Sequence, residues 1–209
     1  PSLRKPVLLI DLGANVDCTA RHLCDFAEMG MLYSERVPSV TNPRVGLLNI
    51  GEERLKGNEL SKTVHRNLQA ASYINFIGNV EGRDIPRGTC DRGSIDVVVC
   101  DGFTGNVLLK FYESLAPMLI GMVSKAADID AAQLRASLKH LDADEHGGAP
   151  LLGVKGVSII SHGKSSPRAI MNAILMALRA YESGMTDEIG RRLADIVPTG
   201  ATTATGTLS

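Results

Sequence analysis

The chain has 209 residues, a net charge of -1 and 44% hydrophobic residues, which is the size and composition of one α/β domain with its own core. The near-neutral charge disfavours a nucleic-acid binder, because such domains usually carry a basic excess. No uninterrupted apolar run approaches the ~20 residues of a membrane span, and no secretory signal opens the chain. We therefore expect a cytoplasmic protein.

Short apolar runs alternate with helical patterns along most of the chain. Thr19 is a suitable N-cap for a first helix that reaches about Val37. Five strands are expected, at Val7–Asp11, Val45–Ile50, Tyr73–Ile77, Ile95–Cys100 and Val157–Ser161. Such alternation predicts a three-layer αβα fold with a mostly parallel sheet, in which the loops that follow the strands gather along one edge.

Residues 107–146 read as a protruding helical hairpin with two apolar stripes. The stripes either pack on each other or on a second copy of the chain, or they bind a membrane surface or a carrier protein. We expect one α/β domain over residues 1–197 and a disordered tail over residues 198–209, which is rich in Thr, Gly, Ala and Ser. The stripes consist of Leu115, Met118, Leu119, Met122 and Val123, and of Leu134, Leu138 and Leu141.

The most informative segment is Ser94–Lys110, SIDVVVCDGFTGNVLLK. It reads as a buried strand that ends at Asp101, a glycine-containing turn, and a helix that carries Lys110. Ligands bind at the carboxyl ends of strands in open α/β sheets, and free N–H groups at a helix start suit a phosphate. The segment therefore predicts an anion site formed by Asp101, Gly102, Thr104, Gly105, Asn106 and Lys110.

Three further polar loops follow strands and are expected near the same edge. Each loop alone is also explained as an ordinary capped turn, because Asn, Asp, Ser and Gly are common there. Four such loops on one sheet edge favour a binding site. The additional candidates are Asn15 and Asp17, Lys56, Asn58 and Glu59, and His162, Gly163 and Ser165.

Other motifs are missing from the sequence. The four cysteines lack CxxC spacing, so reduced and inert thiols are expected. No H-E-x-x-H, calcium loop, Walker motif or G-x-G-x-x-G after the first strand is present, so we expect no metal and no cofactor. His22, His65 and His140 fall within helical patterns and are expected on the surface.

Several long motifs resemble one family. In sequence and in order, seven motifs are similar to the bacterial acyl-[acyl-carrier-protein]:phosphate acyltransferases of phospholipid synthesis, the PlsX family. These motifs are LLIDLGANVDC, NPRVGLLNIGEE, KGNELSK, NFIGNVEGRDI, DVVVCDGFTGNVLLK, GGAPLLGVKG and SHGKSSPRAI. The resemblance covers nearly all of residues 7–178, and it matches only the later part of that enzyme. It implies a fold like those of phosphotransacetylase and the isocitrate and isopropylmalate dehydrogenases.

The resemblance also implies an activity, namely transfer of a fatty acyl group from a carrier-protein thioester to inorganic phosphate. It implies acyl-carrier protein as partner. The apolar stripes of the helical hairpin lead us to expect a homodimer and weak peripheral contact with the inner face of the membrane. An alternative is a phosphotransacetylase-like enzyme that uses acyl-CoA. Another is a non-catalytic domain that binds carrier protein or mediates dimerisation.

Phosphate is itself the nucleophile in such a reaction, so no Ser-His-Asp triad is required. Lys110 or Lys56 would hold the phosphate beside the N–H groups at the helix start. Asn106 and Asn15 would donate to the developing oxyanion, and Asp101 or His162 would move the proton. The sequence leaves the choice between those last two open.

Overall fold

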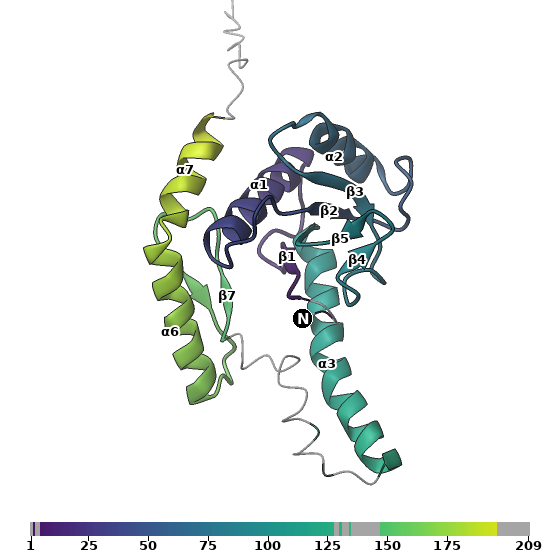
Figure 1. Cartoon of the computed structure of the whole chain (residues 1–209), viewed down its shortest axis with the longest axis vertical. Helices are drawn as coiled ribbons and strands as arrows, with labels where there is room; N and C mark the ends of the chain where they lie inside the picture. The colour runs from purple at the N-terminus through teal and green to yellow at the C-terminus, as the bar shows by residue number, and fades with distance from the viewer. Residues whose placement is uncertain (1, 3–4, 128–129, 131–133, 135–146, 196–209) are drawn as a thin grey trace, which may run out of the picture.

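The main sheet has four parallel strands in the order β1-β6-β2-β3 (Figure 1). In this computed structural model the described residues are 2, 5–127, 130, 134 and 147–195. The strands are β1 (Leu8–Ile10), β2 (Val45–Leu48), β3 (Phe76–Val80) and β6 (Val97–Val99). Their shared direction brings the loops that follow β1, β2 and β6 to one edge, as the alternating sequence predicts.

Strand β6 lies in the middle of the sheet because its residues suit burial on both faces. Val97, Val98 and Val99 are fully buried and pair with β1 on one side and β2 on the other. Branched side chains pack well on a pleated surface. The central strand therefore fixes the position of Asp101, which follows two residues later.

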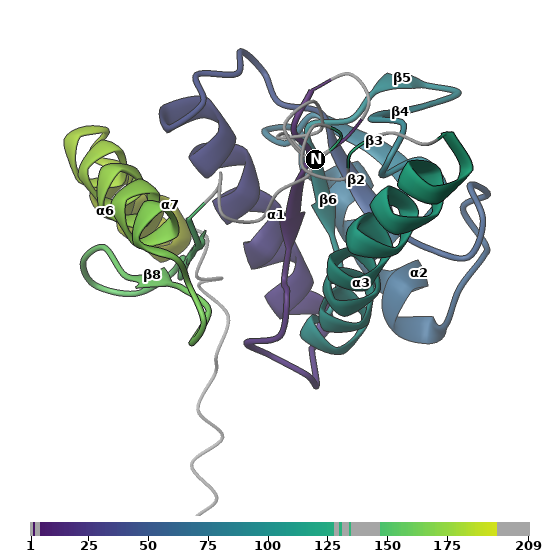
Figure 2. The same ribbon diagram turned by 90° about the horizontal axis from the view of Figure 1, so that it is seen from below.

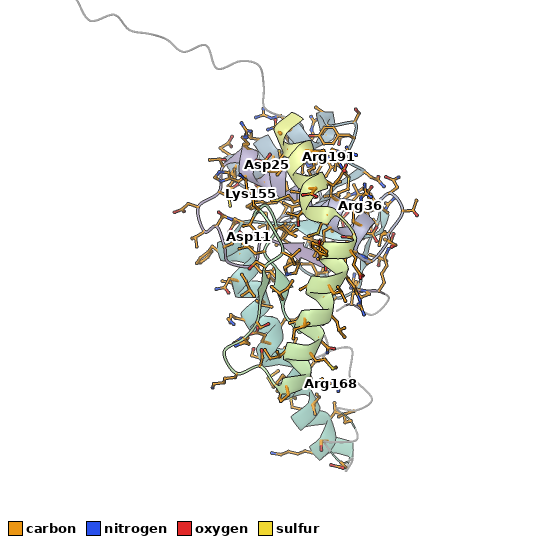
Figure 3. All side chains as sticks on the ribbon, turned by 90° about the vertical axis from the view of Figure 1, so that its left-hand side faces the viewer. Asp11, Asp25, Arg36, Lys155, Arg168 and Arg191 are labelled. Carbon is orange, nitrogen blue, oxygen red and sulfur yellow. The ribbon has the colours of Figure 1, made fainter. Side chains whose placement is uncertain are left out.

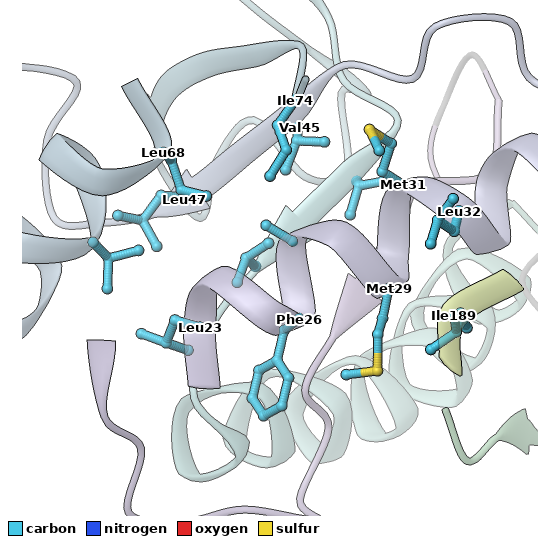
Figure 4. Packing of buried hydrophobic residues seen from close by; sticks show 14 of the residues in the cluster. Leu23, Phe26, Met29, Met31, Leu32, Val45, Leu47, Leu68, Ile74 and Ile189 are labelled. Carbon is cyan, nitrogen blue, oxygen red and sulfur yellow. The ribbon is translucent and has the colours of Figure 1, made fainter. Parts of the chain in front are cut away.

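Two helices cover one face of the sheet. Helix α1 (Ala20–Arg36) begins after Thr19, whose hydroxyl accepts from the backbone N–H of His22, as predicted. Helix α2 (Glu59–Ala70) begins after Asn58, which caps it in the same way. The largest core cluster joins these helices to the sheet, as Figure 4 shows for Leu23, Phe26, Val45, Leu47 and Leu68.

The opposite face carries a smaller cluster and the next helix. Ile77, Val80, Ile95 and Val98 form this cluster. A short hairpin of β4 (Thr89–Cys90) and β5 (Gly93–Ser94) precedes β6. Figure 2 shows α1 on one side of the sheet and α3 on the other, which confirms the predicted αβα layering.

Helix α3 (Gly102–Ala127) extends well beyond the sheet (Figure 1). Among the described residues it is the one helix long and apolar enough to cross a membrane by length and composition alone, with mean hydropathy 1.3 and 6% of the stretch buried. The sequence shows no uninterrupted apolar run of this length, because Lys110 and Glu113 interrupt it. The mean hydropathy of the helix is nevertheless high, so the helix departs from the expectation of no membrane-length apolar segment. The first half of the predicted hairpin is thus helical, whereas most of the second half, 128–146, lies outside the described residues.

The chain after residue 147 differs from the prediction. Val157–Ser161 was expected to add a fifth strand to the parallel sheet, but only β8 (Ile159–Ile160) forms, paired antiparallel with β7 (Ala149–Pro150) in a separate sheet. Ile160 is 56% exposed, so this strand is not buried on both faces as an inner parallel strand would be.

Two final helices follow this small sheet. Helix α6 (Pro167–Glu182) begins after Ser166, whose hydroxyl accepts from the N–H of Ala169. Helix α7 (Met185–Asp195) packs on α1, and Glu188 there pairs with Arg36 across the contact (Figure 3 labels Arg36). Residues 196–209, which include the predicted tail, lie outside the described residues.

Candidate functional site

The loop after β1 is folded around the carboxylate of Asp11. This carboxylate accepts hydrogen bonds from the backbone N–H groups of Gly13, Ala14 and Asn15 at 2.7–2.9 Å, and from the Asn15 side chain at 2.9 Å. Burial raises the pKa of Asp11, but these four donors outweigh it and hold the pKa below its usual value. Asn15 was predicted to donate to a reaction intermediate. One of its amide hydrogens is instead committed to Asp11.

The loop after β6 is folded in a similar way around Asp101. Its carboxylate accepts from the backbone N–H of Thr104 at 2.8 Å and from the Thr104 hydroxyl at 2.9 Å. Asp101 therefore caps the start of α3.

Most N–H groups at the start of α3 have partners within the chain. Gly102 donates to the carbonyl of Asn15 at 2.8 Å, and Gly105 donates to the carbonyl of Asp101 at 2.9 Å. With Thr104 bound to Asp101, this leaves Phe103 as the first-turn residue whose N–H has no partner among the described residues. The N–H groups of Thr104 and Gly105, which were predicted to face a phosphate, are thus bonded to Asp101 within their own turn, and the Gly102 N–H joins the two loops.

Glycines allow the two loops to touch. A Cβ atom on Gly105 would lie 1.8 Å from the carbonyl oxygen of Asp11, and one on Gly102 would lie 2.7 Å from that of Asn15. Because real Cβ atoms essentially never approach closer than 3.0 Å, only glycine fits at either position. The start of α3 is therefore packed directly on the loop that follows β1.

Asn106 lies at this junction with its side chain available. A Cβ on Gly13 would lie 3.6 Å from the Asn106 Oδ1, so the side chain rests against that loop. Asn106 is exposed, and its side chain makes no hydrogen bond within the part of the chain that the structure describes. Of the two predicted oxyanion donors, Asn15 bonds to Asp11, whereas the Asn106 amide is uncommitted among the described residues.

Further along α3, the Lys110, Glu113 and His162 side chains meet. The Glu113 carboxylate lies 2.9 Å from the Lys110 Nζ through one oxygen and 3.7 Å from the His162 Nε2 through the other. The structure thus brings His162 to the same helix as Lys110, although its strand is not part of the main sheet. A Cβ added to Gly163, beside His162, would have no atom within 4 Å. The Ser165 N–H donates to the His162 carbonyl in the same turn.

The loop after β2 forms a separate corner of the same sheet edge. Asn58 caps α2 by accepting from the N–H and the hydroxyl of Ser61, and Glu59 pairs with Lys62 at 2.9 Å. The Lys56 carbonyl accepts from the Asn49 side chain at 3.1 Å, while the Lys56 ammonium has no partner among the described residues. The contacts of these candidates are all local. Asp17 in the loop after β1 is exposed.

Two residues of this region were missed by the sequence interpretation. Asp11 was assigned only to the end of a strand, although an Asp shortly before a glycine is typical of a turn that folds back on its own carboxylate. Glu113 lies three residues after Lys110 on a helix, a spacing that favours ion pairs. No group of three or more His, Cys, Asp or Glu side chains suited to a metal occurs in the described ranges.

The fold and this junction define an α/β domain in which polar loops meet at the carboxyl ends of parallel strands. The sequence model of the family described as "Fatty acid synthesis protein" matches residues 1–188. The chain therefore belongs to this family, the PlsX family that the motifs indicate.

Relatives with curated names agree with one another. The chain is 48% identical to a phosphate acyltransferase from Moorella thermoacetica, over 91% of this chain and 57% of that protein. It is 47% identical to one from Desulfitobacterium hafniense strain DCB-2, over 92% and 59%. It is 45% identical to one from Campylobacter lari, over 93% and 60%. The chain thus spans somewhat more than half the length of the curated relatives it matches.

Proposed function

We propose that this chain carries the reaction centre of a phosphate acyltransferase. Such an enzyme transfers the acyl group of an acylated acyl-carrier protein to inorganic phosphate and so forms acyl phosphate and free carrier protein. The family and the names of its relatives support the reaction class. The observation that carries the proposal is the Asn106 amide, which has no partner among the described residues, at the junction of two strand-end loops and one helical turn before Lys110, whose partner Glu113 also contacts His162.

The chemistry needs placement more than a protein nucleophile. A phosphate oxygen forms a bond to the thioester carbonyl carbon, the C–S bond breaks, and the departing thiolate takes a proton. Lys110 and His162 would attract phosphate, with Glu113 holding both cations in place. Asn106 would donate to the oxyanion of the tetrahedral intermediate. Because both oxygens of Asp101 accept from Thr104, we favour His162 over Asp101 as the proton carrier.

The partners and the location are part of the same proposal. An acyl-carrier protein would bring the thioester, and the protein would act as a cytoplasmic homodimer with weak contact to the inner face of the membrane. Supporting this, apolar side chains on α3 are exposed beyond the site, among them Phe111, Met118 and Met122. Binding to vesicles of anionic phospholipid, followed by flotation, would test the membrane contact.

The reaction is tested by measuring acyl phosphate formation in the complete gene product that carries this sequence. Long-chain acyl-carrier protein and the matching acyl-CoA are compared as donors, each with and without phosphate. Phosphate-dependent acyl phosphate from the carrier protein supports the proposal. Turnover from acyl-CoA alone would favour the phosphotransacetylase alternative, and carrier-protein binding without turnover would favour a non-catalytic domain.

Substitution of Asn106 by alanine is expected to lower turnover at least tenfold while the thermal unfolding midpoint stays within about 2 °C. Loss of one oxyanion donor typically costs a factor of 10² to 10³ in turnover. The side chain is exposed and bonds nothing among the described residues, so the fold should not depend on it. Asn106→Asp, which keeps the shape but lacks the N–H donors, should be equally impaired. Turnover close to that of the unmodified protein would exclude Asn106 from the mechanism.

A further inference from the structure

A cavity lies along β3, away from the junction described above. Its volume is about 520 Å³, within the range of small-molecule pockets. In the strand order β1-β6-β2-β3 it is separated from β1 by three strand spacings, on the order of 14 Å. The residues that matter here are Arg44, Arg54, Arg92, His65, Phe76 and Glu52, all of which line it.

The cavity has an excess of positive charge. Three arginines line it, and the only carboxylate among its lining residues is Glu52, which also faces Arg83 outside the lining. Arg92 lies 3.4 Å from Glu52. Arg54 is exposed and has no hydrogen bond or ion pair within the described part of the chain. Glu52 therefore pairs with Arg92, while the guanidinium groups of Arg44 and Arg54 have no carboxylate partner among the described residues.

Two of the three arginines, Arg44 and Arg92, are held in place by backbone carbonyl oxygens. The Arg44 Nε donates to the carbonyl of Ser94 at 2.8 Å, and its Nη2 donates to that of Arg92. The Arg92 Nη2 donates in turn to the carbonyl of Asn79. Backbone carbonyls orient a guanidinium without cancelling its charge. These contacts hold two positive groups at the cavity wall and leave other N–H groups of each available for a ligand.

His65 adds a buried nitrogen to the same cavity. This residue is 95% buried, contrary to the surface position expected from its helical pattern, and its ring packs edge-on against Phe76 at 5.2 Å. The His65 Nδ1 lies 2.9 Å from the Asn79 Oδ1. Because the Asn79 amide nitrogen donates to the Glu53 carbonyl, its oxygen is the acceptor and Nδ1 carries the proton. The Nε2 is left without a partner among the described residues.

We propose that this cavity binds a phosphate monoester, with the phosphate group between Arg54, Arg92 and Arg44 and its one protonated oxygen donating to the His65 Nε2. Guanidinium groups match phosphate oxygens in geometry, and a monoanionic phosphate, unlike a carboxylate ion, also keeps an O–H donor for this nitrogen. The volume exceeds what inorganic phosphate fills, and Phe76 and Ile77 provide apolar wall for the rest of an ester. This site is independent of the proposed reaction centre.

The proposal is tested by titrating the isotope-labelled chain with phenyl phosphate and following backbone amide shifts by NMR. We expect saturable shifts at Gly78 and Gln69, which line the cavity, and weaker binding of inorganic phosphate there. Shifts around Phe103 and Asn106 report separately on the reaction centre. Benzoate, a carboxylate with the same ring, distinguishes the phosphate group from a general anion effect.

Two variants identify the contacts. Arg54→Ala should weaken phenyl phosphate binding at least tenfold without changing stability, because Arg54 bonds nothing among the described residues. His65→Asn keeps a donor near the Nδ1 position for Asn79 but removes Nε2, and should weaken binding by a similar factor. Arg66→Ala, an exposed arginine on the same helix that does not line the cavity, should bind normally. Absence of shifts at Gly78, equal binding of benzoate, or unchanged affinity in Arg54→Ala would each overturn the proposal.

Discussion

Replacement of Gly105 by alanine should lower the free energy of unfolding by about 3 kcal/mol or more, the upper end for inserting one methyl group into a packed site. The new Cβ would lie 1.8 Å from the carbonyl oxygen of Asp11 and 3.0 Å from the sulfur of Cys100. The first contact is with backbone, which cannot rotate away as a side chain can. The start of α3 would have to separate from the loop after β1, and the junction that holds Asn106 would open.

Gly121→Ala provides the matched control, because Gly121 lies on the same helix with nothing within 4 Å of an added Cβ. Alanine is favoured over glycine inside a helix by roughly 1 kcal/mol, so this variant should be as stable as the original or slightly more so. Urea unfolding followed by circular dichroism at 222 nm measures both variants. If Gly105→Ala unfolded at the same urea concentration as the unmodified chain, the close packing of the two loops would be wrong.

Gly105 also shows what the sequence could and could not predict about the site. The sequence predicts Gly105 as part of an anion site, and the structure shows that the group packed against it is the chain's own Asp11 carbonyl. A sequence pattern indicates that a backbone position must be small. Which atoms fill the space depends on how two distant loops meet, and no local pattern contains that information.

The same distinction applies to the fold. Strands β1, β2 and β6, the Thr19 cap and the αβα layering follow from local hydrophobic patterns and turn residues, and they were predicted. Strand β3 (Phe76–Val80) was also predicted, but three residues too early, at Tyr73–Ile77. The fate of Val157–Ser161 was not, because an apolar run is equally compatible with an inner strand and with the short antiparallel pair that forms. His65 was placed on the surface for a similar reason: only its partner Asn79, fourteen residues later, explains its burial.

Asp11→Asn is expected to lower the free energy of unfolding by about 3 kcal/mol at pH 7, because charged hydrogen bonds contribute about 1.5–3 kcal/mol each and the amide cannot replace all four. Its NH₂ group would face backbone donors that the carboxylate now accepts from. Asp17→Asn, an exposed aspartate in the same loop, is the control and should change stability by less than about 0.5 kcal/mol.

The pH dependence separates the charge of Asp11 from its shape. Its pKa is lowered in the folded chain, so the ionised form stabilises the fold. This contribution is fully present above the pKa of an unfolded aspartate, about 3.9, and is lost as the pH falls through the lower folded value. The stability difference between the original chain and Asp11→Asn should therefore be constant from pH 7 to 5 and shrink below about pH 4.

Comparison with the variant at each pH is necessary because another buried carboxylate acts in the opposite direction. Burial raises the pKa of Glu28, so its protonation on acidification favours the fold and would mask part of the Asp11 effect in the original chain alone. The Glu28 contribution is common to both proteins and cancels in their difference. A difference that stayed constant down to pH 3 would mean that Asp11 acts through shape, and that the loop beside Asn106 does not depend on a buried negative charge.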